Sequence, residues 1–284
     1  MDTFGNRINE LLQNAKSLLF LQGEMAQLTY LSFEQNIKWV NQLEDDKTIP
    51  ISYPLGYRAD NTAIMSQPRN YTKEELVERY AHLGVNKLPV DGIFQLVTIM
   101  ETLMNDVLRT ILVEYPNKIP SKKKIDVDSV LTANSIEQIK LNLVDGILNE
   151  IAYKSPKDYA TEFEKYTGVN LLENPVFHKY IELKATRDIH IHNGGIANDI
   201  YLNKSGVVAR VKSGQYLPVD IPYFLNSYEQ CLQLNEILEN ELDKIWPSEN
   251  YRDRKSQNTK LEKEDVIEKV IEQSKKESEG EKTA

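Results

Sequence analysis

Apolar residues recur at helical spacing along most of this chain, and this periodicity most limits the folds open to it. Spacings of three and four residues gather side chains on one face of an α-helix. Within residues 6–47 the pattern includes Ile8, Leu11, Leu12, Ala15, Leu18, Leu19, Ile37, Val40 and Leu43. Residues 91–115 are apolar on nearly every side, so we expect that helix at the centre of the core. The sequence therefore predicts an all-α fold, an antiparallel bundle of amphipathic helices.

Short capping patterns predict where several helices begin. They are Thr72 with Glu75, Ser135 with Gln138, Ser155 with Pro156, and Asn174 with Pro175. The first two pairs have the spacing of a capping box, in which two side chains satisfy exposed backbone N–H groups. The last two place a capping residue before a proline at the first helical position. The helix that starts at Pro175 should stop at Gly194 and Gly195.

Composition divides the chain into three parts. Residues 1–87 form an N-terminal helical region of unknown role, which includes a connection at 48–70 rich in Pro, Asn and Ser. Residues 88–247 form the helical bundle, in which β-branched residues around two Lys-Ser-Gly turns predict a small β-hairpin near 200–219. Residues 248–284 are dominated by charge and should form a disordered tail or a solvated helix.

The overall composition excludes several classes of protein. No apolar run reaches the roughly 18 residues of a membrane span, and the start of the chain lacks a secretion signal. The single cysteine, Cys231, has no partner for an internal disulfide and should be a small core residue, so we expect a cytoplasmic protein. A net charge of −9 argues against nucleic-acid binding by bulk charge but leaves room for a few well-placed cations.

The densest group of chemically active side chains lies in Arg-Asp-Ile-His-Ile-His-Asn-Gly-Gly, residues 187–195. At 100° per residue, Arg187, Asp188 and His192 fall on the apolar side of their helix. The opposite face carries His178, Lys179 and Glu182. Polar groups among apolar ones must pair, line a cleft or face another subunit. A structural interpretation stays open, in which Asp188 pairs with His192 while Arg187 extends to solvent.

A metal site is the weaker interpretation of the two histidines. His190 and His192 are two residues apart and point to opposite sides of a helix, so they share a metal only if the backbone is extended there. No cysteine pair, His-Glu-x-x-His motif or carboxylate cluster accompanies them. We therefore predict no metal at these residues.

Arg187 and His192 fit the R-x4-H motif of the HEPN superfamily, with a polar residue, Asp188, directly after the arginine. The run from Arg187 through His-Asn-Gly-Gly resembles the RiboL-PSP and MAE-like HEPN groups, and the resemblance covers residues 88–247. It implies a metal-independent endoribonuclease without a cofactor, in which the 2′-hydroxyl of RNA attacks the adjacent phosphate to leave a 2′,3′-cyclic phosphate. His192 would transfer protons, and Arg187 would stabilise the charge on the phosphate. Asp188 would orient the imidazole, with Asn193 and His190 as supporting residues, although Asn193 better suits a helix cap.

The resemblance also implies partners. HEPN proteins commonly dimerise, so we expect a homodimer that shares the site between subunits, with Tyr180, Ile181 and Ile191 as the apolar flank. A toxin or anti-phage defence role implies an antitoxin or defence-system partner protein. Some HEPN toxins carry a tyrosine two residues after the histidine for modification by an antitoxin, and Gly194 stands there instead. The alternatives are a non-catalytic HEPN dimer that binds RNA, a nucleotide or a protein as an adaptor, and a helical scaffold in which the motif is structural.

Overall fold

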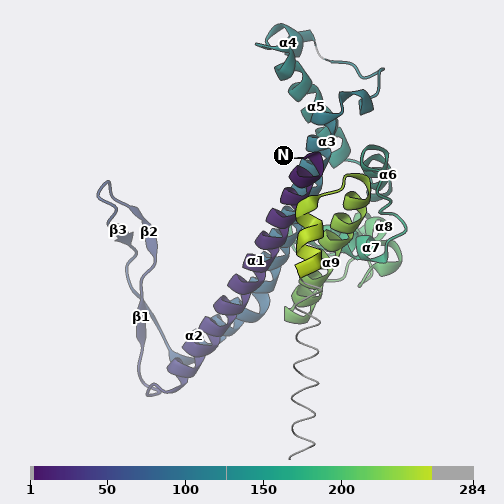
Figure 1. Cartoon of the computed structure of the whole chain (residues 1–284). Helices are drawn as coiled ribbons and strands as arrows, with labels where there is room; N and C mark the ends of the chain where they lie inside the picture. Colours follow the sequence, from purple (N-terminus) through teal and green to yellow (C-terminus); the bar gives the residue numbers. More distant parts are fainter. Residues whose placement is uncertain (1–2, 126, 258–284) are drawn as a thin grey trace, which may run out of the picture.

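The computed structural model describes residues 3–125 and 127–257 and confirms an all-α bundle. Its helices are α1 (Phe4–Asn41), α2 (Lys73–Ala81), α3 (Leu88–Glu114), α4 (Val127–Leu131), α5 (Ile136–Ala152), α6 (Pro156–Thr167), α7 (Pro175–His192), α8 (Asp199–Ser205) and α9 (Ile221–Ile245). A π-helical turn, η1 (His82–Lys87), joins α2 to α3 into one long rod. Short 3-10 turns follow α3 and α8, namely η2 (Pro116–Lys118) and η3 (Gly206–Val208). The N-terminal limit predicted for the bundle, residue 88, thus falls inside a continuous helical run (Figure 1).

Helix α3 is the centre of the core, as its pattern predicts. Ile93, Leu96, Met100, Val107 and Ile111 are buried along it. Helices α1, α5, α6, α7 and α9 all pack against α3, and Figure 1 shows α1 running alongside it for much of its length. The N-terminal half of α1 therefore belongs to the same hydrophobic core as the bundle.

The predicted caps are present. Thr72 and Glu75 form both hydrogen bonds of a capping box, and the side chains of Ser155 and Asn174 each accept a backbone N–H at the start of α6 and α7. Ser135 accepts the N–H of Gln138, but the Gln138 side chain donates to Asn142 instead of completing the box. Cys231 is a fully buried core residue, as expected, and burial raises its pKa to about 12.

Residues 48–70, expected to be an irregular connection, instead form a β-arm. Strand β1 (Ile49–Ile51) pairs with β4 (Arg69–Tyr71), and β2 (Pro54–Tyr57) pairs with β3 (Ala63–Met65), both antiparallel. Tyr71 is buried with Val40 and Leu76, which anchors the base of the arm to the ends of α1 and α2. The rest of the arm stands away from the helices (Figure 1). Pro50, Gly56 and Asn70, which suggest a loop, lie within these short strands, and Asn61 lies in the turn between β2 and β3 with a φ of 63°.

The prediction of a β-hairpin near residues 200–219 is wrong. Asp199–Ser205 is helix α8, and a single isolated bridge joins Ile196 to Tyr216. Asn198 accepts the N–H of Tyr201 and so caps the helix, and the Tyr201 side chain is fully buried. A cap and an anchoring aromatic residue outweigh the β-branched residues around them.

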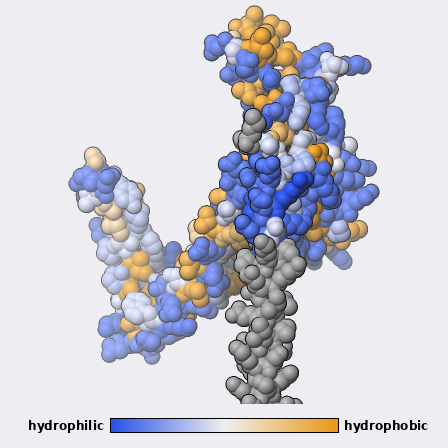
Figure 2. Space-filling model, viewed as in Figure 1, coloured by the Kyte–Doolittle hydropathy of each residue, from blue (hydrophilic) through white to orange (hydrophobic). Residues whose placement is uncertain are grey.

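The N-terminus of α1 is joined to the C-terminal end of α9. The hydroxyl of Ser248 donates to the side chain of Asn6 at 2.8 Å, and Asn9 donates to Glu239 at 3.1 Å. Gly5 lies against the backbone of Pro247, with no space for a Cβ. Residues 249–257 then form a further helix, and residues 258–284 of the predicted charged tail lie outside the described residues. On the face that Figure 2 shows, polar residues cover most of the bundle, whereas α4 presents apolar side chains.

A substitution at Gly5 tests the junction between α1 and the C-terminal end of α9, with a second helical glycine as the control. We expect Gly5→Ala to lower the free energy of unfolding by about 1–3 kcal/mol, because its Cβ would collide with the carbonyl of Pro247. Gly146→Ala in α5 is the matched control: nothing lies within 4 Å of its Cβ, so it should gain roughly 0.5–1 kcal/mol of stability. Urea unfolding of the two variants measures both changes. Equal stabilisation by both substitutions would contradict the close contact at Gly5.

Candidate functional site

The motif residues Arg187, Asp188 and His192 lie in the C-terminal part of α7. Asn193 leaves the helix, and the N–H groups of Asn193 and Gly195 both donate to the carbonyl of Ile189, at 2.9 and 3.2 Å. Gly194 and Gly195 take left-handed φ values of 59° and 81°, which other residues rarely adopt. His192 is consequently the last residue of α7 and is exposed, as expected from the double glycine.

Arg187 is held between two carboxylates. Its Nη2 donates to Glu101 of α3 at 2.9 Å, and its Nε lies 3.1 Å from Oδ1 of Asp188. Lys184 also pairs with Glu101, at 2.6 Å. The Arg187 side chain is only 18% exposed. The structural interpretation in which Arg187 extends to solvent is therefore wrong.

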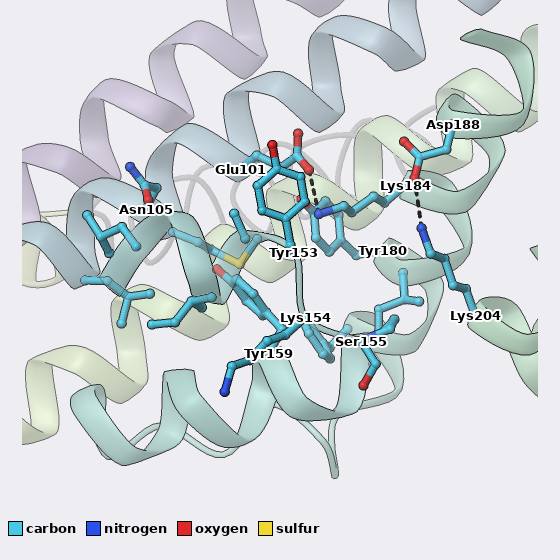
Figure 3. Close-up of a pocket in the computed structure, with 18 of the residues that line it drawn as sticks. Glu101, Asn105, Tyr153, Lys154, Ser155, Tyr159, Tyr180, Lys184, Asp188 and Lys204 are labelled. Carbon is cyan, nitrogen blue, oxygen red and sulfur yellow. Dashed lines mark hydrogen bonds and ion pairs between the residues drawn. The ribbon is translucent and has the colours of Figure 1, made fainter. Parts of the chain in front are cut away.

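Asp188 pairs with cations and not with histidine. Its Oδ2 accepts a hydrogen bond from Lys204 of α8 at 3.1 Å, shown in Figure 3. Among the described residues, no hydrogen bond joins Asp188 to His192. No contact therefore supports the expectation that Asp188 orients the imidazole. Lys204 is a site residue that the sequence did not reveal, because it lies 16 residues away from Asp188 on a different helix.

His192 and Asp188 share the wall of a small pocket of about 270 Å³ at the junction of α7 and α8. Asn193, Asn198 and Lys204 line the same pocket. Within the described part of the chain the His192 ring has no hydrogen-bond partner, so both ring nitrogens are available to a ligand. Asn193 donates to the carbonyl of Ile196 at 2.5 Å, which closes the turn after α7 and agrees with a capping role.

His190 is placed in a different environment. Its Nε2 lies 2.9 Å from the carbonyl oxygen of Leu217, and its ring meets the edge of Tyr216 with 5.8 Å between centroids. Burial lowers the pKa of His190 below its ordinary value, and nearby Arg210 lowers it further. The residue therefore fastens the 206–219 segment to α7 and takes no place in the pocket.

A buried ion pair that the sequence did not reveal holds this region together. Glu182, predicted on the polar face of α7, is only 5% exposed. Its carboxylate accepts hydrogen bonds from Thr186, Tyr201 and Tyr223 at 2.8 Å each and from Arg210 at 2.9 Å. Burial raises the pKa of Tyr201 to about 12, so its hydroxyl stays a donor to Glu182.

Arg210 completes the cluster from the segment after α8. Its guanidinium lies 3.7 Å from the centroid of the Tyr223 ring and also donates to the carbonyl of Pro218 at 2.7 Å. The cluster therefore ties α7 to α8, to the following segment and to α9, and so fixes the walls around His192.

Two expectations about partners change. Tyr180 and Ile181 are buried inside the chain, at 2% and 8% exposure, so they cannot be the flank of a dimer interface as predicted. The apolar residues exposed near the end of α7 are Ile191, Ile196 and Ile200, at 47%, 40% and 63%. The helical wheel identified an apolar face but could not tell packing within the chain from packing between chains.

Searches against models of known families, curated proteins and solved structures find no match to this chain. In the described ranges, no cluster of three or more His, Cys, Asp or Glu side chains is arranged to hold a metal ion. Each helix of the described residues is too short or too polar to cross a lipid bilayer.

Removal of the Glu182 carboxylate should destabilise the fold. We expect Glu182→Ala to lower the free energy of unfolding by about 3–5 kcal/mol, because it leaves Arg210 and two tyrosine hydroxyls without their acceptor. Glu173→Ala, at an exposed position one residue before α7 is capped, should change it by less than about 0.5 kcal/mol. Denaturant unfolding compares the two. A similar small change in both variants would show that the cluster is not a determinant of stability.

The buried His190 should make stability depend on pH. Its folded pKa lies below its ordinary 6.5, so the unfolded chain binds a proton more readily, and stability falls as the pH drops through that value. We expect the free energy of unfolding to fall more between about pH 8 and about pH 5.5 in the native protein than in His190→Gln. The same fall in both proteins would contradict the effect of burial.

Proposed function

We propose that this protein is a metal-independent endoribonuclease of the HEPN type, acting on RNA in the cytoplasm. One observation carries the proposal. The imidazole of His192 is exposed and unpartnered within the described residues, at the wall of a pocket that also holds Lys204 and two asparagine side chains. The guanidinium of Arg187 lies on the same helix five residues earlier. Phosphodiester cleavage requires a proton-transfer group close to a cation and hydrogen-bond donors, and His192, Lys204 and the two asparagines supply these groups in one pocket.

The chemistry follows from these groups. His192 takes the proton of the RNA 2′-hydroxyl, whose oxygen forms a bond to the adjacent phosphorus while the bond from phosphorus to the 5′-oxygen breaks. The departing 5′-oxygen receives a proton, and the products are a 2′,3′-cyclic phosphate and a 5′-hydroxyl. Lys204, which lines the pocket, stabilises the negative charge on the phosphate during this exchange, and Arg187 does so once the phosphate has displaced Glu101 and Asp188 from it.

A second copy of the chain supports both proton transfers. One His192 serves one side of the phosphodiester, and a two-fold dimer adds the other. Ile191, Ile196 and Ile200 are exposed around the end of α7 and are the apolar surface on which such a dimer would form. We place the enzyme in a toxin or anti-phage defence system, where a partner protein would restrain it.

The second candidate is a non-catalytic HEPN dimer that binds RNA, a nucleotide or a protein. The observation in its favour is the state of Arg187, whose side chain is 18% exposed and held by Glu101 and Asp188. A phosphate would have to displace these carboxylates before it could use the guanidinium. In the adaptor the motif arginine would therefore keep a structural role.

Cleavage of total RNA in EDTA separates the two candidates. We expect the native protein to produce cyclic-phosphate ends and His192→Ala to cut at least about 100-fold more slowly, because general acid–base catalysis is lost. His82→Ala is the matched control, since His82 is exposed on η1 and lies in neither pocket. It should keep full activity, and thermal unfolding should show that all three proteins are folded.

Glu101→Gln tests whether the ion pair restrains Arg187. Loss of the Glu101 charge removes one of the two carboxylates that pair with Arg187, so a phosphate reaches the guanidinium more easily and this variant should cut RNA at least as fast as the native protein. If neither the native protein nor Glu101→Gln cuts RNA, the nuclease proposal is wrong and the adaptor stands. Equal cutting by the native protein and His192→Ala would instead remove His192 from catalysis.

A further inference from the structure

A second, larger pocket lies between α3, α5, α6 and α7. Its volume is about 620 Å³, which is within the range of small-molecule sites. Its walls are mostly apolar and include Met104, Leu108, Leu148, Ile151, Phe177 and Ile181. Figure 3 shows side chains from these elements converging on it. Asp188 and Lys204, at one edge, also line the pocket of His192, but the apolar walls take no part in the proposed cleavage of RNA.

Three tyrosines are among the residues that line the pocket. Tyr153, Tyr159 and Tyr180 come from the end of α5, from α6 and from α7. Planar aromatic rings favour other planar rings, stacked or edge to face. The occupant that fits these walls is therefore an aromatic molecule.

The hydroxyl of Tyr180 is a buried polar group without a partner. The residue is 2% exposed, and its hydroxyl oxygen forms no hydrogen bond within the described part of the chain. Burial raises the pKa of Tyr180 well above its ordinary value, and the nearby charge of Glu101 raises it further. The group is therefore a neutral O–H donor. Native structures rarely leave such a donor unsatisfied, because it costs about 1–3 kcal/mol.

The charged residues around the pocket are already paired. Glu101 is bound to Lys184 at 2.6 Å, Asp188 to Lys204 at 3.1 Å and Lys154 to Glu162 at 2.8 Å. A charged ligand would have to break one of these pairs or remain without a counter-charge. The pocket therefore suits an uncharged occupant.

We propose that this pocket binds an uncharged aromatic small molecule that carries a carbonyl or ring-nitrogen acceptor for the Tyr180 hydroxyl. The apolar walls supply most of the binding free energy through burial of the ligand. The Tyr180 O–H supplies orientation. The site does not include His192, although Asp188 and Lys204 line both pockets, and ligand binding here does not require the proposed nuclease activity.

Prodan, an uncharged naphthalene with one carbonyl group, is the probe for this site, because its emission shifts to the blue in apolar surroundings. We expect saturable binding of one prodan per chain to the full-length protein. Tyr180→Phe should weaken binding about fivefold, the equivalent of one hydrogen bond of about 1 kcal/mol. The same substitution should leave the free energy of unfolding unchanged or higher, because it removes an unpaired hydroxyl, so lost binding cannot be ascribed to unfolding.

Two tryptophan substitutions control for adsorption to exposed apolar surface. Ala152→Trp adds bulk at the pocket from an exposed position at the end of α5 and should reduce prodan affinity at least tenfold. Leu131→Trp lies on α4, away from the pocket lining, and should leave the affinity unchanged.

Three results would overturn the proposal. The first is the absence of saturable prodan binding, and the second is equal affinity in Tyr180→Phe and the native protein. The third is tighter binding of the anionic probe 1-anilinonaphthalene-8-sulfonate at the same site, which would contradict an uncharged ligand.

Discussion

A buried carboxylate must be paired, and the arrangement of this protein around its motif follows from that requirement. Glu182 is buried in the middle of α7, and the chain supplies it with donors from α7, α8, α9 and the segment between α8 and α9. Such a cluster does not add much net stability over an apolar core, but it accepts only one geometry. The position of α8 against α7, and with it the pocket of His192, is specified by this pairing.

Most helices could be predicted from the sequence because their signals are local. Thr72, Ser155 and Asn174 are caps whose partners lie within three residues, and the apolar pattern of residues 91–115 needs no knowledge of its neighbours. The β-arm and α8 could not be predicted in this way. Both are fixed by anchoring aromatic residues, Tyr71 and Tyr201, whose burial depends on residues far away in the sequence.

The candidate site shows the same division. Arg187, Asp188 and His192 are found from their spacing, and the structure brings the last two to one pocket. The residues that pair with Arg187 and Asp188, namely Glu101 and Lys204, belong to other helices, so the sequence near the motif gives no sign of them. A helical wheel also treats every face that is not apolar as solvent-exposed, which is why it places Glu182 on the polar face. It cannot tell packing within a chain from packing between chains, which is why it predicts Tyr180 in an interface.

The contact between α1 and α9 sets an order of events during translation. Asn9 and Glu239 are 230 residues apart, so at bacterial or eukaryotic rates of synthesis α1 leaves the ribosome roughly 10–50 s before its polar partner exists. Throughout this interval the faces of α1 that carry Asn9 and Asn6 have no acceptor or donor from the C-terminal part of the chain. Helix α1 can pack against α3 early in this interval, but its surroundings are complete only once α9 has been made.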